Sequence, residues 1–142
     1  MALTETQRAE WIESVQDNWK SLEGAPEAVK GDKEVVLVAV QKNGYALQYA
    51  ADELRGDREV VLAAVQQNGY ALQNAPNELR GDREVVLAAV QQNGYTLQYA
   101  TDDLKGDREF VLSAVQKNGL VLTFIEERDI VLAVVQQDWR LL

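Results

Sequence analysis

The chain has 142 residues, a formal net charge of −9, and neither histidine nor cysteine. These absences remove the commonest general base, the thiol nucleophile and most zinc ligands, and no glycine-rich loop of the kinds that hold nucleotide phosphates occurs. The acidic balance opposes binding to nucleic-acid backbones or anionic lipid. We therefore expect no enzymatic activity, no cofactor and no metal, and neither a nucleic acid nor a membrane as partner.

The sequence contains no recognisable targeting or membrane-spanning segment. No apolar run approaches membrane-spanning length, and residues 1–11 lack the basic and hydrophobic pattern of a signal peptide. A cytoplasmic location is therefore the default expectation. The length is that of a single domain, 1–142, which is large enough to bury a core.

A fixed period of 25 residues organises the chain. Asp32, Asp57, Asp82 and Asp107 share one position, and Gly44, Gly69, Gly94 and Gly119 share another. Such a period predicts a stacked array in which each unit buries its apolar face against its neighbours. We expect an all-α solenoid of about six units, with degenerate units at both ends: 7–31, 32–56, 57–81, 82–106, 107–126 and 127–142.

Each unit is expected to begin with one long helix, called the spine helix below. Asp57 is the expected N-cap, and Glu59 lies in the first turn, where the helix dipole favours an anion. The apolar block VVLAAV follows, and Gly69 is the expected left-handed residue that ends the helix. A buried strand is the alternative for this block, but the caps and the alanines favour a helix. The expected spine helices lie near Gln7–Trp19, Asp32–Asn43, Asp57–Asn68, Asp82–Asn93, Asp107–Asn118 and Arg128–Trp139.

Two short helices are expected to complete each unit. Tyr70–Ala75 forms the first, and Pro76 ends it, because proline suits the first turn of a helix and not its interior. The segment PNELR then makes a single turn with Leu79 pointing inward. The periodic glycines are expected to need a positive φ or a close backbone approach. Val61, Leu62, Val65 and Leu72, with their equivalents in other units, are expected to be almost fully buried.

Several short motifs have structural explanations. Residues 55–57 and 80–82 read Arg-Gly-Asp, the tripeptide that integrins bind, but here the glycine ends one helix and the aspartate caps the next. Asn-Gly pairs are hairpin signals in β proteins, whereas behind a capped helix they mark its end. The repeated Asp57 and Glu59 pair lacks the ligand spacing of a calcium loop. An acid copied into every unit is typical of capping, whereas a catalytic acid normally occurs once.

One glutamine position is kept in all six units: Gln16, Gln41, Gln66, Gln91, Gln116 and Gln136. The next position varies between lysine and glutamine, at Lys42, Gln67, Gln92 and Lys117. Two interpretations are open. In the one we favour, the amide bonds the turn backbone of an adjacent unit, so that no buried polar group is left unpaired. In the other, the glutamines line a groove suited to an extended peptide.

Aromatic residues of the second layer provide candidate partner-binding residues. They are Tyr45, Tyr49, Tyr70, Tyr95 and Tyr99, flanked by Gln48, Gln73 and Gln98. Tyrosines can act as anchors with a polar rim in protein interfaces. The alternative is that they pack within the second layer with their hydroxyl groups at the surface.

The segments DREVVLAAVQQNGYALQ and PNELRGDREVVL resemble the bacterial and protist repeat family known as domain of unknown function 4116. The similarity is strongest over residues 32–118. The resemblance implies an α-helical repeat scaffold with no assigned chemistry, and hence no catalytic residue to carry over. Members that resemble this chain include secreted effectors of intracellular bacteria, so the resemblance also implies that secretion is an option.

Two functions follow as expectations. The first is a non-catalytic scaffold that mediates a protein–protein interaction, with a protein or peptide as partner. The second is a purely structural spacer, or a self-associating module with no separate ligand. The helix at Arg128–Trp139 lacks a second layer, so a homo-oligomer formed through its apolar face would support the second function.

Overall fold

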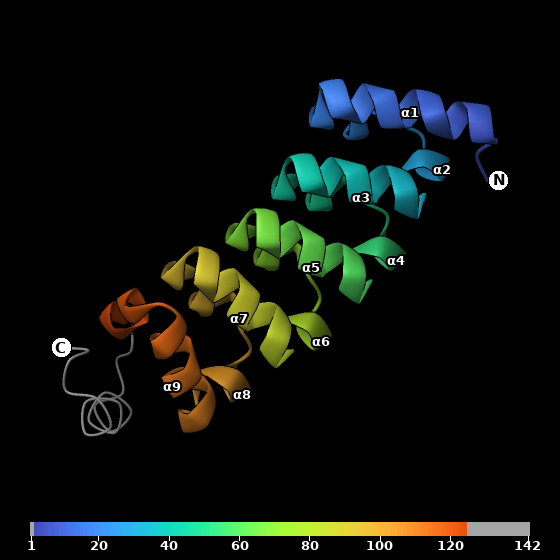
Figure 1. Ribbon diagram of the computed structural model, residues 1–142. Helices are drawn as coiled ribbons and strands as arrows, with labels where there is room; N and C mark the ends of the chain where they lie inside the picture. The colour runs from blue at the N-terminus through green and yellow to red at the C-terminus, as the bar shows by residue number, and fades with distance from the viewer. Residues whose placement is uncertain (1, 125–142) are drawn as a thin grey trace.

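The computed structural model describes residues 2–124 and shows an all-α array, as the period predicted (Figure 1). The expected sixth unit, including the helix at Arg128–Trp139, lies outside the described residues. The spine helices are α1 (Glu5–Asp17), α3 (Lys33–Lys42), α5 (Arg58–Gln67), α7 (Arg83–Gln92) and α9 (Arg108–Lys117). The 3₁₀ helices are η1 (Trp19–Leu22), η2 (Gly44–Tyr49), η3 (Gly69–Asn74), η4 (Gly94–Tyr99) and η5 (Gly119–Phe124). The single-turn helices are α2 (Glu27–Lys30), α4 (Asp52–Arg55), α6 (Asn77–Arg80) and α8 (Asp102–Lys105).

The spine helices stack side by side, and each is rotated relative to the one before it (Figure 1). The direction changes steadily from α1 to α9, so the array is twisted. The single-turn helices α2, α4, α6 and α8 follow one edge of the stack. Any row of equivalent residues therefore runs across successive helices along a twisted path.

Aspartate capping starts the central spine helices as expected. The Asp82 side chain accepts a hydrogen bond from the Val85 backbone N–H at 3.1 Å, and Asp57 caps α5 in the same way. The first helix differs, because α1 uses a capping box in which Thr4 and Gln7 bond each other's backbone. This box starts the helix at Glu5, two residues before the expected start.

The end of each spine helix differs from the expectation. No residue in 2–124 has a positive φ, so Gly69 is not a left-handed terminator. The chain instead leaves the helix at Asn68, whose backbone is extended with φ −152° and ψ 110°. The Asn68 side chain then accepts a hydrogen bond from the Tyr70 N–H at 3.0 Å and starts η3. One asparagine therefore ends one helix and caps the next.

Close packing explains the glycine at position 69. A Cβ atom on Gly69 would lie 2.5 Å from the carbonyl oxygen of Ala89 in the next spine helix. A second periodic row of glycines lies at 31, 56, 81 and 106. Within that row Gly56 is the least crowded, since the nearest atom to its Cβ would be 3.7 Å away. Of the two expected reasons for the glycines, close approach applies to Gly69, and a positive φ applies to no glycine within residues 2–124.

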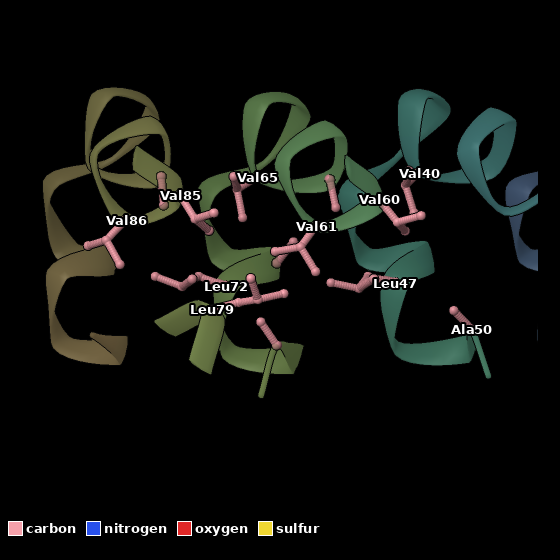
Figure 2. Packing of buried hydrophobic residues seen from close by; sticks show 14 of the residues in the cluster. Val40, Leu47, Ala50, Val60, Val61, Val65, Leu72, Leu79, Val85 and Val86 are labelled. Carbon is pink, nitrogen blue, oxygen red and sulfur yellow. The ribbon is translucent and has the colours of Figure 1, made fainter. Parts of the chain in front are cut away.

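The core lies between the spine helices and the 3₁₀ layer (Figure 2). Val61, Val65 and Leu72 are fully buried, as predicted. Leu62 is only half-buried, so that part of the prediction is wrong. The reason is helical periodicity: Leu62 shares a face with Arg58 and Gln66, four residues away on either side, and that face points out of the stack.

The break at Pro76 is confirmed. Pro76 is the N-cap of α6, and Leu79 within this single turn is buried. In two other units the equivalent residue donates a backbone hydrogen bond to the preceding unit: Ala51 to Lys30 O at 3.0 Å, and Thr101 to Arg80 O at 3.1 Å. Pro76 has no N–H and cannot make this link.

Candidate binding surface

Ion pairs connect the start of each spine helix to the start of the next. Arg58 Nε lies 3.0 Å from Asp82 Oδ2, and a terminal nitrogen of the same guanidinium lies 2.6 Å from Glu84. Asp82 thus caps its own helix through Oδ1 and holds the preceding unit mainly through Oδ2, which accepts the shorter of its two hydrogen bonds from Arg58. The hydrogen bond from Arg58 holds the pKa of Asp82 below its usual value. The equivalent pairs are Arg8 with Asp32 and Glu34, Lys33 with Asp57 and Glu59, and Arg83 with Asp107.

From the sequence, these acids are expected only to cap the helix or to interact with its dipole, and the basic residue of the preceding unit is a partner that the sequence reasoning missed. A signal was present, because a basic residue directly follows the cap aspartate in units 32–56, 57–81, 82–106 and 107–126. Because the stacked spine helices run in the same direction, this basic residue lies next to the cap aspartate of the following unit. The aspartates of both Arg-Gly-Asp tripeptides, Asp57 and Asp82, are therefore occupied by a helix cap and an ion pair.

The glutamine row does not have the structural role that we favoured. Gln16, Gln41, Gln66, Gln91 and Gln116 are all exposed. Within residues 2–124, none of these five amide groups takes part in a hydrogen bond. Their position on the outer face of the spine helices, away from the turns, explains the error. Gln136 lies outside the described residues.

Other amides carry the structural role. Asn43, Asn93 and Asn118 repeat the Asn68 cap by accepting a hydrogen bond from the backbone N–H two residues later. Gln67 reaches back to the preceding unit, where it accepts a hydrogen bond from Gly44 N at 2.5 Å and donates one to Lys42 O at 3.4 Å. The glutamine bonded to a neighbouring turn is therefore Gln67, one position after Gln66 of the glutamine row.

The tyrosines connect neighbouring units. Tyr49 stacks on Trp19 with ring centroids 6.3 Å apart, and Tyr70 meets Tyr99 edge-on at the same distance. The Tyr70 hydroxyl also accepts a hydrogen bond from the Asn93 side chain at 3.3 Å. These contacts match the packing alternative for the second layer.

Part of the predicted second-layer set does surround open hollows. Gln48 and Tyr49 line one hollow together with Lys30 and Arg55. Gln98 lines an equivalent hollow two units later, with Arg80 and Lys105. Of the remaining candidates, Gln73 and Tyr95 are exposed and Tyr45 is half-buried. The structure therefore places the eight candidate residues along one layer and gathers three of them in hollows.

A second row of side chains accompanies the exposed glutamines. Ile12, Leu37, Leu62, Leu87 and Leu112 occupy the position four residues earlier and are half-buried. On a helix, residues four apart lie one above the other on the same face. Each spine helix thus presents one aliphatic side chain next to one unbonded amide, a surface that we call the Leu–Gln face.

Residues 2–124 contain no group of three acidic, histidine or cysteine side chains placed to hold a metal ion. Among them, no helix has both the length and the apolar character needed to cross a bilayer.

The sequence profile of a family described as domain of unknown function (DUF4116) matches the chain five times, at residues 11–55, 32–80, 57–105, 82–128 and 107–142. The chain belongs to this family. Each DUF4116 match spans about two of the 25-residue units, and successive matches overlap. The family profile therefore covers a pair of neighbouring units, and the ion pairs and the core contacts lie between such neighbours. No curated protein and no solved structure matches the chain.

Proposed function

We propose that this DUF4116 array is a non-catalytic scaffold that binds a protein or peptide partner. The observation that carries the proposal is the glutamine row. Its side chains are exposed and unbonded in the five described units, yet the residue type is the same in all six. At the adjacent exposed position the type changes freely, so exposure alone does not account for the glutamine.

Site-specific photo-crosslinking tests the proposal. A photoreactive amino acid replaces Gln66 on the spine layer, Gln73 on the 3₁₀ layer, or Glu53 on a single-turn helix. All three sites are exposed, so the substitutions should leave the fold intact. A scaffold gives a discrete, stoichiometric crosslinked partner from one site and not from the others.

A spacer predicts a different result. No site would then yield a discrete product, and sedimentation would show a monomer at all concentrations. A self-associating module would give crosslinks between copies of the chain and a concentration-dependent dimer. Either result contradicts the scaffold proposal.

A further inference from the structure

A row of glutamates borders the Leu–Gln face. Each lies three residues before the aliphatic residue of its spine helix, and residues three apart are neighbours on a helix surface. The side chains of Glu59 and Glu84 are 66% and 70% exposed, so solvent or a partner can still reach them. We call this row the glutamate border; it consists of Glu34, Glu59, Glu84 and Glu109.

The ion pairs leave the glutamate border with an excess of negative charge. Arg58 is one cation that contacts two carboxylates, Asp82 and Glu84, so this junction keeps a net charge of −1. The same count holds at two other junctions, those of Arg8 with Asp32 and Glu34 and of Lys33 with Asp57 and Glu59. The negative charge therefore recurs from unit to unit along the border.

The cations on the spine helices offset this charge only near the ends of the described array. Lys42 and Lys117 end α3 and α9, and Arg108 lies beside Glu109; none of these three cations has an ion pair within residues 2–124. The central helices α5 and α7 end instead in the neutral Gln67 and Gln92. The excess of negative charge is therefore clearest over α5 and α7.

An open hollow between α1 and α3 combines the apolar and acidic features of this surface. It has a volume of about 310 Å³ and is lined by Glu5, Arg8, Ala9, Ile12 and Glu34. Arg8 already pairs with Glu34 at 3.1 Å, whereas Glu5 has no ion pair within the described residues. A lysine or arginine side chain suits such a hollow, because its aliphatic stem covers apolar groups while its charged end meets a carboxylate.

Charge complementarity selects among the possible occupants. Nucleic acid and anionic lipid have the same sign as the border, and a second copy of the chain would place two acidic borders together. A single metal ion is not matched, since residues 2–124 hold no group of three acidic side chains placed to bind one. A basic polypeptide offers cations for the glutamates, apolar side chains for the aliphatic row and backbone groups for the glutamines.

We propose that the Leu–Gln face and its glutamate border bind a basic polypeptide segment in which lysine or arginine residues lie next to apolar residues. The cations pair with the glutamates of the border, and the apolar side chains cover aliphatic residues such as Leu62 and Leu87. The exposed amides of Gln66 and Gln91 bond the backbone of the segment. The proposal rests on the scaffold function and names the class of its partner.

Fluorescence anisotropy with synthetic peptides tests the two kinds of complementarity. The probe is a fluorescently labelled, end-blocked peptide of four Lys-Leu-Ser triplets. One control has serine in place of each leucine, and the other has glutamate in place of each lysine. We expect the probe to bind at least about tenfold more tightly than either control, because one control cannot cover the aliphatic row and the other is repelled by the border.

Matched variants of the full chain identify the face. Glu59→Gln with Glu84→Gln removes two carboxylates from the border and keeps the capping aspartates, whereas Glu53→Gln with Glu78→Gln removes two exposed carboxylates from the single-turn helices. Both double variants lose the same amount of negative charge, so only the position of the change differs. The first should weaken binding of the probe by about fivefold or more, and the second by less than about twofold.

Three results would overturn the inference: no binding of the Lys-Leu-Ser peptide, equal binding of either control peptide, or equal weakening by the two double variants. A concentration-dependent dimer that crosslinks through position 66 would overturn it as well, because the occupant is then a second copy. The scaffold proposal would survive the peptide failures if photo-crosslinking still captured a discrete partner.

Discussion

Gly69 and Gly56 should respond in opposite directions to substitution by alanine. Gly69→Ala places a Cβ 2.5 Å from the Ala89 carbonyl oxygen and 3.1 Å from Thr96 Cγ2. That carbonyl cannot withdraw freely, because it accepts the hydrogen bond from Asn93 N at 3.0 Å that closes α7. Gly56→Ala meets no atom closer than 3.7 Å, and the Gly56 φ of −97° is accessible to alanine.

The magnitudes follow from these distances. Overpacking against a fixed backbone costs about 1–3 kcal/mol, so Gly69→Ala should lower the free energy of unfolding by at least that amount. Gly56→Ala should raise it by about 0.4–1 kcal/mol, because alanine restricts the unfolded chain without straining the native one. The two variants should therefore differ by roughly 1.5–4 kcal/mol.

Urea denaturation followed by far-ultraviolet circular dichroism measures this difference. Equal slopes for both variants would show that they unfold over the same surface, which makes the midpoints comparable. If Gly69→Ala proved as stable as Gly56→Ala, the close approach of α7 to η3 would be wrong, and with it our explanation of that glycine.

Three further predictions use the same assay. Leu72→Ala should cost about 2–5 kcal/mol, whereas half-buried Leu62→Ala should cost only about 1–2 kcal/mol; equal costs would place Leu62 in the core after all. Asp82→Asn keeps a capping oxygen but loses the ion pair, which costs at most about 1 kcal/mol near neutral pH. The pKa of Asp82 is lowered in the folded state, so the stability difference between the parent chain and Asp82→Asn should persist above about pH 4. It should vanish as the pH falls through the folded-state pKa. A stability difference that grows in acid would contradict this prediction. Gln66→Ala should change the free energy of unfolding by less than about 0.5 kcal/mol, whereas Gln67→Ala should cost about 1 kcal/mol through its bonds to the preceding turn, and the reverse order would restore the structural interpretation of the row.

The sequence was sufficient for the architecture because a strict period leaves few alternatives. Capping aspartates and the proline at 76 placed the boundaries of the central helices within a residue or two. The orientation of each spine helix was harder to predict. The block VVLAAV is apolar throughout, so nothing in it marks Leu62 as the residue that points outward.

The amides show a second limit of sequence reasoning. Gln66 and Gln67 are adjacent exposed amides of one helix, but only Gln67 is hydrogen-bonded, to Gly44 and Lys42 of the preceding unit. Whether a polar side chain meets a partner depends on groups in other units, about 25 residues away, and repetition alone does not reveal them. The ion pairs between units belong to the same class, since Arg58 and Asp82 are 24 residues apart.

Each cap aspartate caps its own helix and also pairs with the basic residue of the preceding unit, and this makes the units interchangeable. Removal of residues 57–81 would join Gly56 directly to Asp82, and Lys33 would then face Asp82 and Glu84 in place of Asp57 and Glu59. The new junction would have the same kinds of atoms as the old one. Recombination between repeats in the gene could therefore lengthen or shorten such a protein by whole units. Each product would keep the same ion pairs between neighbouring units.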